Sequence, residues 1–358
     1  MISIEQNILA PALDRVRGGL ARTGIPAARH VLLNVQGGHM QLMTANGVVQ
    51  MQTSLPLSGE SFKVAAPAEL FDIVQCLHGP ITLEPKGLNL TVKANGTRLR
   101  LQCIGTDDCP QFPMIDDGQT SMIAAADLLR CLAFVERASA EVTDPRAYLT
   151  GVLLAFAEKS LTCVGSNGHM MGVAGMSVSG EQPGSVIVPA KVVAEVIRAI
   201  RNQGASTVTI ARGNGRVRFD VGSVQLTGSL LQGAYPDWGK VIKGVSGNAA
   251  AIEVPRQQFV DALSRVSVIA GQEARVLLRL ESGKLTLEIV NGDQGAEEKI
   301  AIAGEHTGQV ALNRRQLAIA AQAIAGEKMN LKITNERAVV MVTGDSRREA
   351  YLLAPMND

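Results

Sequence analysis

The sequence predicts an α+β protein built from three similar domains. A short apolar strand followed by an amphipathic helix occurs three times, over 2–16, 122–135 and 252–266. Each copy then contains a second strand and helix, over 62–77, 186–200 and 310–324. The repeat length of about 120 residues is too long for a solenoid unit and suits a small autonomous domain. Three domains are therefore expected, over 1–118, 119–245 and 246–358.

The remaining segments of each copy read as antiparallel strands. Strand-like segments lie between the two helices, as in 30–55 and 150–175, and three more follow the second helix. Asn95-Gly96, Gly213-Asn214-Gly215 and Gly344-Asp345-Ser346 interrupt the later strands, and Asn and Gly tolerate the positive φ of hairpin turns. Each domain is thus predicted to contain two helices and two antiparallel sheets. Short polar linkers are expected at 116–119 and 244–248.

Composition sets broad limits on function. An apolar content of 46% suffices for a core in each domain, and a net charge of +1 leaves the partner to be decided by where the charges lie. The five cysteines are odd in number and have no C-x-x-C pair, so they are predicted to be reduced core residues of a cytoplasmic protein. No basic-then-apolar leader or bilayer-length apolar stretch is present, so a soluble protein is expected.

The sequence contains no recognisable catalytic or cofactor motif. Gly213-Asn214-Gly215 joins two predicted strands, so it is interpreted as a hairpin and not as a dinucleotide fingerprint. Asp107-Asp108 and Asp116-Asp117 adjoin turn residues, which favours solvated or capping carboxylates over a metal site. His169 has no nucleophile or second His at a motif spacing. No cofactor, metal or catalytic residue is predicted, and an enzyme that acts on DNA or nucleotides through His169 remains a weaker alternative.

Basic residues gather on the predicted helices. Lys191 and Arg198 are seven residues apart, so they share one helix face opposite the apolar face. Several helix segments carry more Arg and Lys than acid, a pattern typical of phosphate contact without base reading. Aromatic residues make up only 3% of the chain, which argues against stacking platforms for single strands.

Three motifs in register with the repeat resemble one family. They are the loop at 165–169 (GSNGH), the segment at 234–238 (AYPDW) with Val241-Ile242, and the ending at 351–356 (YLLAPM). Together they resemble the bacterial DNA polymerase III β subunit, the sliding clamp, from end to end. The resemblance implies three clamp domains per chain and a non-catalytic processivity factor. It also implies a head-to-tail homodimeric ring that encircles duplex DNA without sequence preference and has no membrane partner.

The same resemblance implies three sets of site residues. A groove would bind short peptides of DNA polymerase, the clamp loader and repair factors through Leu149, Ser166, Gly168, His169, Met170, Met171, Pro236, Lys240, Val241, Asn313, Gln316, Leu352, Ala354, Pro355 and Met356. DNA contacts would come from Arg22, Thr143, Arg146, Lys191, Arg198 and Arg201. The dimer interface would use Arg98, Leu99, Arg100 and Leu101, with Leu and Arg on opposite faces of an edge strand, against Ile269, Ala270, Glu297 and Glu298.

Several positions depart from the family pattern. Met170, Ala354 and Gln75 stand where Arg, Met and Arg are usual in the family. Gln316 stands where an aromatic often sits, Asn357 where Arg occurs, and Arg275 where some members have Phe. These departures leave open an alternative, in which the protein is a clamp-like ring of a specialised or mobile-element pathway with altered partners.

Overall fold

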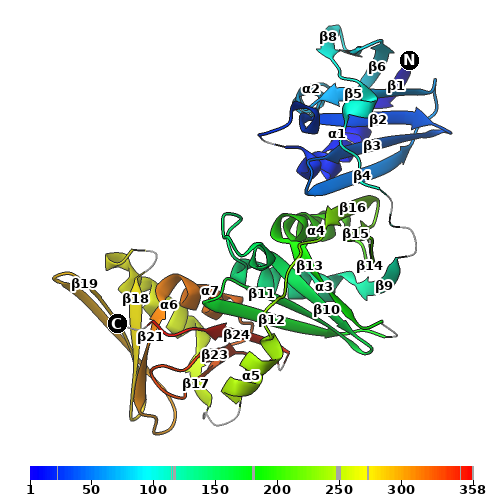
Figure 1. Ribbon diagram of the computed structural model, residues 1–358. Helices are drawn as coiled ribbons and strands as arrows, with labels where there is room; N and C mark the ends of the chain where they lie inside the picture. Colours follow the sequence, from blue (N-terminus) through cyan, green and yellow to red (C-terminus); the bar gives the residue numbers. More distant parts are fainter. Residues whose placement is uncertain are drawn as a thin grey trace. The chain divides into compact units, whose positions relative to one another are not determined.

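The chain folds into two compact units of helices and antiparallel sheets. The computed structural model describes residues 1–21, 23–113, 115, 118–179, 182–246, 251–271, 274–346 and 348–356. Unit 1 comprises Met1–Leu129 and Lys191–Leu230, and unit 2 comprises Arg130–Ala190 and Leu231–Asp358 (Figure 1).

One order of elements occurs three times: strand, helix, four strands, helix, three strands. The first copy contains β1 (Ile2–Glu5), α1 (Gln6–Val16), β2 (His30–Gln36), β3 (His39–Ala45), β4 (Val49–Pro56), β5 (Phe62–Pro67), α2 (Glu69–Cys76), β6 (Pro80–Lys86), β7 (Asn89–Ala94) and β8 (Thr97–Gln102). The second contains β9 (Gln119–Ala124), α3 (Ala125–Val135), β10 (Gly151–Ala157), β11 (Ser160–Ser166), β12 (Met170–Ser177), β13 (Gly184–Pro189), α4 (Ala190–Gln203), β14 (Thr207–Gly213), β15 (Arg216–Val221) and β16 (Val224–Ser229).

The third copy repeats this order after an additional helix, α5 (Trp238–Ser246). It contains β17 (Ala251–Pro255), α6 (Arg256–Val266), β18 (Arg275–Glu281), β19 (Lys284–Asn291), β20 (Gln294–Ala301), β21 (Gly308–Asn313), α7 (Arg314–Ala323), β22 (Lys328–Lys332), β23 (Val340–Thr343) and β24 (Glu349–Leu353). A short 3-10 turn follows the first helix of each copy: η1 (Arg17–Gly19), η4 (Glu136–Ala138) and η6 (Ser267–Ile269). The six predicted strand–helix segments and the α+β class are confirmed.

The predicted linker at 244–248 is wrong in part. Residues 244–246 belong to α5, because Trp238, Val241, Ile242 and Val245 recur at helical spacing and pack on an apolar cluster. Gly247 and Asn248, like Asp116 and Asp117 of the other predicted linker, lie outside the described residues.

Unit 1 contains an eight-stranded and a four-stranded sheet. The larger has the order β5-β2-β3-β4-β16-β15-β14-β9, so strands of the first two copies join at β4 and β16. The smaller has the order β1-β6-β7-β8. Helix α1 packs against α2 and β4 (Figure 1), and it buries Leu9, Leu13 and Val16 at the expected spacing of three to four residues.

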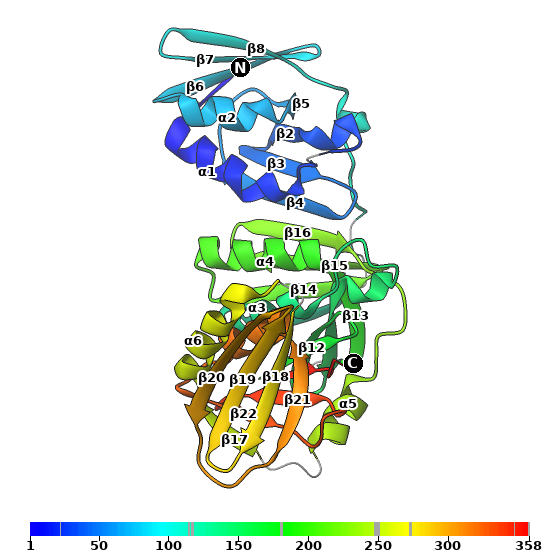
Figure 2. The same ribbon diagram turned by 90° about the vertical axis from the view of Figure 1, so that its left-hand side faces the viewer.

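Unit 2 has the corresponding pair of sheets. Its eight-stranded sheet has the order β13-β10-β11-β12-β24-β23-β22-β17, and here strands of the second and third copies join at β12 and β24. Its four-stranded sheet, β20-β19-β18-β21, stands beside α6 (Figure 2). Neighbouring copies therefore share one continuous sheet, which the pattern of a single copy does not reveal.

Tyr351 fills the core where β12 and β24 join. Its side chain is fully buried, its hydroxyl donates to the Phe134 carbonyl, and the two ring centroids lie 4.7 Å apart. Gly172 stands directly opposite Tyr351 in the ladder, and a Cβ added there would lie 3.1 Å from Tyr351 Cε1. The absence of a side chain at Gly172 therefore makes room for the tyrosine ring.

The five cysteines are all free thiols, and one of them departs from the prediction. Cys103, Cys109, Cys131 and Cys163 are buried, whereas Cys76 at the end of α2 is exposed. Burial raises the pKa of the Cys103 thiol to about 11, so this side chain stays protonated and unreactive at neutral pH. Within the described residues, no helix combines the length and apolar character needed to cross a membrane.

Candidate functional site

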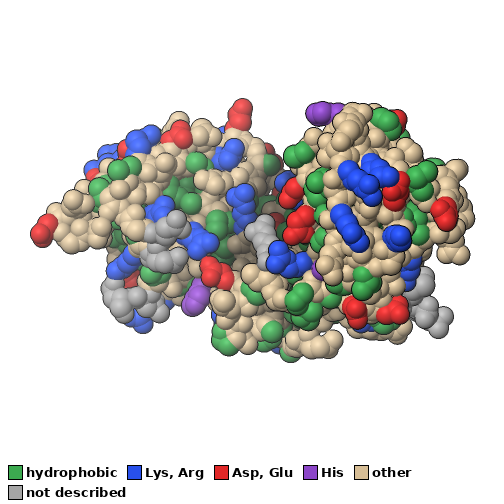
Figure 3. Space-filling view, turned by 90° about the horizontal axis from the view of Figure 1, so that it is seen from above, with side chains coloured by type: hydrophobic (Ala, Val, Ile, Leu, Met, Phe, Trp, Pro, Cys, Tyr) green, Lys and Arg blue, Asp and Glu red, His purple; other side chains and the backbone are tan. Residues whose placement is uncertain are grey.

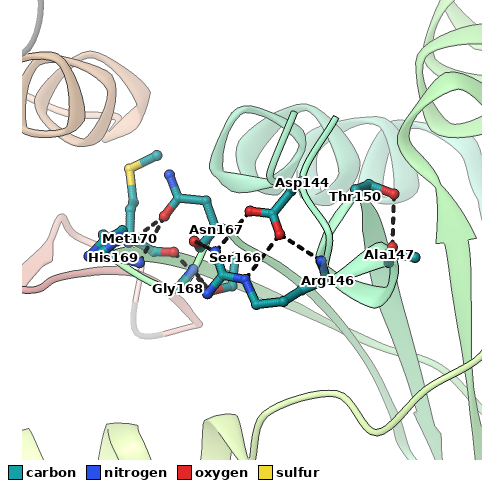
Figure 4. A network of polar contacts seen from close by, with 9 residues as sticks. All are labelled: Asp144, Arg146, Ala147, Thr150, Ser166, Asn167, Gly168, His169 and Met170. Carbon is teal, nitrogen blue, oxygen red and sulfur yellow. Dashed lines mark hydrogen bonds and ion pairs between the residues drawn. The ribbon is translucent and has the colours of Figure 1, made fainter. Parts of the chain in front are cut away.

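The β11–β12 hairpin of unit 2 carries a tightly hydrogen-bonded turn. Asn167 Oδ1 accepts from the backbone N–H groups of His169 at 2.9 Å and Met170 at 2.7 Å. Ser166 Oγ donates to the Met170 carbonyl at 2.9 Å and accepts from Gly168 N at 3.1 Å. Gly168 has a φ of +89°, a backbone conformation that favours glycine. The sequence G-S-N-G-H thus specifies one conformation of the turn (Figure 4).

Arg146 fastens this turn to the preceding loop. Its Nε and Nη2 donate to the Asp144 carboxylate at 3.0 and 2.8 Å, and Nη2 also donates to the Asn167 carbonyl at 3.0 Å (Figure 4). A Cβ added at Gly168 would lie 2.5 Å from Arg146 Nη1, so the guanidinium packs directly on the glycine. Hydrogen bonding to Arg146 lowers the pKa of Asp144 from its ordinary value of 3.8 to about 2.

Arg146→Gln is expected to return the pKa of Asp144 toward 3.8. Because the Asp144 pKa is depressed in the folded chain, the charged pair persists at neutral pH and is lost only as the pH falls from 3.8 toward about 2. Titration of the side-chain carboxyl carbons by NMR measures this directly. Asp237 serves as the control, because its pKa is lowered by Lys240 and not by Arg146. An unchanged Asp144 midpoint in Arg146→Gln would show that Arg146 does not lower the pKa of Asp144.

The C-terminal segment of the third copy passes the β11–β12 turn and forms a hydrogen bond to it. Ala354 N donates to the His169 carbonyl and Met356 N donates to the Ala311 carbonyl, both at 2.8 Å. The neighbouring Asn313 caps α7, because its side chain accepts from Gln316 N at 3.1 Å. These bonds bring together residues that are far apart in the sequence.

An apolar wall borders the same region. Trp238, Val241 and Ile242 of α5 pack with Tyr235 against buried residues of the eight-stranded sheet, including Met171 and Leu352. Tyr235 Oη donates to the Val164 carbonyl at 3.2 Å, and burial raises the Tyr235 pKa above its usual value. The hydroxyl therefore remains protonated and anchors the segment before α5.

A polar pocket of about 410 Å³ opens beside this turn. It is lined by Arg137, Ser139, Ala140, Glu141, Thr143, Asp144, Arg146, Asn167, His169, Met170, Asn313, Arg315, Gln316 and Ile319. Unit 2 therefore has an apolar wall formed by α5 and a charged pocket at the start of α7. The arrangement can bind a ligand, and the described residues contain no cluster of three or more His, Cys, Asp or Glu side chains placed to hold a metal ion.

Comparison with known proteins identifies the family. Residues 125–237 match the DNA polymerase III beta subunit central domain, and residues 246–357 match its C-terminal domain. The chain belongs to the DNA polymerase III β subunit family. As a family member it is a non-catalytic subunit, a sliding clamp that acts in DNA replication.

Relatives match over nearly their whole length. The chain is 27% identical to the beta sliding clamp of Pseudomonas putida, with 99% of each chain covered, and 28% identical to that of Proteus mirabilis, with 99% of this chain and 98% of the relative covered. The crystal structure of the Pseudomonas aeruginosa β subunit superposes with a TM-score of 0.94 at 25% identity over all of both chains. A Bartonella birtlesii sliding clamp bound to griselimycin has a TM-score of 0.92 at 26% identity, covering 100% of this chain and 99% of that one.

Most of the residues that the family resemblance assigns to the peptide groove lie at the apolar wall or at the polar pocket. His169, Met170, Asn313 and Gln316 line the polar pocket. Met171, Val241 and Leu352 belong to the apolar wall, and Ala354 adjoins the turn. Two departures from the family pattern, Met170 and Gln316, both lie at the polar pocket.

The remaining predicted groove residues differ in accessibility. Leu149, Ser166 and Leu352 are each 2% exposed, so their side chains lie below the surface of the predicted groove. Lys240, by contrast, is exposed and pairs with Asp237 at 3.3 Å. Met356 lines a separate cavity of about 400 Å³ that also includes Arg275, and Pro236 and Pro355 are half-buried.

The predicted DNA-contact residues fall into two places. Thr143 and Arg146 line the polar pocket of unit 2. Lys191 and Arg198 line a basic pocket of about 920 Å³ in unit 1, formed by Arg17, Gly18, Leu20, Ala21, Thr23, Arg29, Asn46, Ala68, Lys191, Glu195 and Arg198. Arg201 is exposed on α4 and lines neither pocket, and Arg22 lies outside the described residues.

Sequence reasoning missed Arg29 in the basic pocket. Arg29 closes a short 3-10 turn, η2 (Pro26–Arg29), and not an amphipathic helix, so no periodic basic face pointed to it. Only the fold brings this turn next to α4.

The predicted interface residues lie on and near sheet edges. On β8, Leu99 and Leu101 are half-buried while Arg98 and Arg100 are exposed, as the predicted alternation requires. Glu297 and Glu298 lie on β20, where they pair with Lys299 at 2.7 Å and with Arg265 at 2.6 Å. Ile269 and Ala270 are half-buried beside the hairpin that leads into β20, and the Ile269 carbonyl accepts from Asn291 Nδ2 at 2.7 Å.

Proposed function

We propose that two chains close head to tail into a ring that encircles duplex DNA and tethers DNA polymerase and other replication and repair proteins. Each chain would contribute three domains, over 1–118, 119–245 and 246–358, and the ring would act in the cytoplasm. The observation that carries the proposal is the pair of sheet edges left by the repeat. Among the described strands, β8 and β20 each have a single neighbour in their four-stranded sheets.

These two edges correspond to the strands that join neighbouring copies within the chain. β4 and β12 are the third strands after the first helix, as is β20, and β16 and β24 end their copies, as does β8. The pairs β4–β16 and β12–β24 are both antiparallel. A pair between β8 and β20 of the partner subunit would therefore repeat a contact that the chain already makes twice. A head-to-tail contact of this kind closes after two copies when it lies on a two-fold axis.

The repeat also fixes the register of the proposed pair. Gln225 stands opposite Gln52 across β4 and β16, and their side chains are hydrogen-bonded. Counted from the hairpin turns, the matching positions are Arg98 on β8 and Glu297 on β20. Both side chains are exposed within one chain, and opposite residues of an antiparallel pair point to the same face. Arg98 would thus meet Glu297 of the partner subunit.

The apolar side of the edge follows the same register. Leu99 corresponds to Leu226, which stands opposite Met51, so Leu99 would stand opposite Ala296 of the partner subunit. Leu99 and Ala296 are both half-buried in the single chain. Closure would bury these apolar groups between the sheets and their helices.

The groove of unit 2 is proposed to bind short peptide segments of partner proteins. The apolar wall offers Met171 and Val241, and flexible Met side chains adapt to different partners. Griselimycin, which is bound to sliding clamps of two relatives, is proposed to bind this chain in the same groove. Duplex DNA would be contacted through phosphates by cations of both units, which gives binding without sequence preference.

Molar mass measured by light scattering tests ring closure. A value near twice 37.8 kDa is expected for the parent chain. Arg98→Glu and Glu297→Arg are each expected to weaken the dimer, and the two together are expected to restore it, by about 0.2–1 kcal/mol for an exposed pair. A parent chain that is monomeric at every concentration would contradict the ring, and a double variant weaker than both single variants would contradict the register.

A further inference from the structure

One pair of facing residues has the same place in all three copies. A leucine on the first strand after the first helix faces a residue of the fourth strand: Leu32 opposite Ala65, Leu153 opposite Ile187 and Leu277 opposite Ala311. In each copy the carbonyl of the second residue accepts a backbone hydrogen bond from the chain beyond its last strand, donated by Ile104, Leu231 or Met356. The three pairs are therefore equivalent positions of the repeat.

The chain covers the leucine of this pair in the first two copies. Leu32 belongs to an apolar cluster with Cys109 of the segment after β8, and Leu153 belongs to a cluster with Tyr235 of the segment after β16. Each of these two leucines is 6% exposed. Leu277, in contrast, is half-buried and lines the cavity of about 400 Å³ beside β21, which we call the β21 cavity. This position accommodates a segment of chain in two copies, and in the third it is open within the described residues.

The β21 cavity is lined by two cations, Arg275 and Arg337, and by one acid, Glu336. Arg337 is exposed in the loop between β22 and β23, where its backbone N–H donates to Asn335 Oδ1 at 2.9 Å. On the face drawn in Figure 3, Lys and Arg side chains lie beside Asp and Glu side chains in several places. The Arg337 guanidinium, by contrast, forms no ion pair or hydrogen bond with any residue in the described part of the chain. It is available to a ligand.

The C-terminal segment connects the apolar wall with the β21 cavity. Leu352 belongs to the apolar cluster of the wall, and Met356, four residues later, lines the cavity. Since an extended chain spans at most about 3.3–3.6 Å per residue, the backbones of these two residues lie within about 14 Å of each other. An extended peptide bound at the wall therefore needs only about four or five further residues to reach the cavity.

We infer that the β21 cavity is an additional subsite for partner peptides that selects an acidic side chain, with Arg337 as the specificity-determining contact. The inference rests on the proposed peptide-binding function and extends the groove beyond the apolar wall. Leu277 and Met356 would contact the apolar part of the peptide segment, and Arg337 would pair with its carboxylate. A carboxylate is favoured because the cavity lining has two cations and one acid.

Peptide selection tests the inference without a known partner. A phage-displayed library of random dodecapeptides is selected against the parent chain and against Arg337→Glu. Lys159→Glu is the control, because it makes the same change of charge at an exposed turn of unit 2 that lines neither the polar pocket nor the β21 cavity. Peptides selected by the parent and the control are expected to share an Asp or Glu about four or five residues from their apolar residues. Those selected by Arg337→Glu are expected to carry Lys or Arg at that position.

Fluorescence anisotropy then measures the preference. The probes are the most frequent peptide selected by the parent, labelled with fluorescein, and the same peptide with its shared acidic residue replaced by the amide. The parent is expected to bind the acidic peptide more tightly by up to about fivefold, as for an exposed ion pair. Arg337→Glu is expected to reverse this preference, and Glu336→Gln is expected to increase it, because that variant removes the acid from the cavity lining. Trp238 fluorescence verifies that each variant is folded.

The outcomes separate this inference from the proposed groove. An Arg337→Glu chain that selects the same peptides as the parent, or keeps the parent's preference for the acidic peptide, would overturn the inference. If those peptides still competed with griselimycin, the proposed groove would stand without the additional subsite. A parent chain that selects no peptide above the level of an unrelated protein would overturn both the groove and the inference.

Discussion

Leu99→Asp is expected to convert the ring into single chains, with dimer association weakened by at least about 100-fold. In the proposed register Leu99 of β8 stands opposite Ala296 of the partner subunit, where closure removes both from water. A carboxylate at that position would be buried without a partner, which costs about 3–5 kcal/mol. Each 1.4 kcal/mol is about tenfold in affinity.

Sedimentation velocity over a range of protein concentrations measures this effect. Ile8→Asp is the matched control, because Ile8 is 51% exposed and belongs to α1 and not to an edge strand. The control is expected to dimerise like the parent. Equal dimer stability for Leu99→Asp and Ile8→Asp would place the interface elsewhere than on β8.

Tyr351→Ala is expected to destabilise unit 2 by about 3–5 kcal/mol, the usual cost of truncating a large buried aromatic side chain. The aromatic side chain of Tyr351 is fully buried, contacts Phe134 and fills the space that Gly172 leaves open. It therefore holds together the two copies that share the eight-stranded sheet. For a unit of this size the loss corresponds to a fall of roughly 10 °C in the unfolding midpoint.

The single tryptophan makes the measurement specific. Trp238 packs against the core of unit 2, so its fluorescence reports the unfolding of that unit. Tyr351→Phe removes only the hydrogen bond to the Phe134 carbonyl and is expected to cost about 1–2 kcal/mol. If Tyr351→Ala and Tyr351→Phe had the same unfolding midpoint, the aromatic side chain of Tyr351 would not be what holds the two copies together.

Much of the fold could be predicted because its signals are local. Helical spacing of apolar residues located α1 and α4, and the turn chemistry of Asn95 and Asn214 is realised as positive φ values of 42° and 52°. The joining of copies into eight-stranded sheets depends on contacts between strands more than 150 residues apart, such as Met51 opposite Leu226. Helix α5 was missed because glycine and polar residues near its end resembled a linker.

The candidate site was predictable only through resemblance to a family. Motif positions such as His169 and Pro355 identified which segments to compare. The bonds that bring them together, such as Ala354 N to the His169 carbonyl, leave no mark in composition or periodicity. The bond of Arg146 to the Asn167 carbonyl is also a tertiary result, because the two residues belong to different loops. Arg29 shows the same limit, since a cation outside a periodic helix gains meaning only from its neighbours.

Retention on circular DNA tests the central claim most directly. The purified protein is loaded by its clamp loader onto a nicked circular duplex and onto the same duplex made linear, and both are then filtered. A closed ring predicts that the protein stays on the circle and is lost from the free ends of the linear molecule. Equal retention on the two DNA forms would contradict the account, because binding would then depend on contact alone.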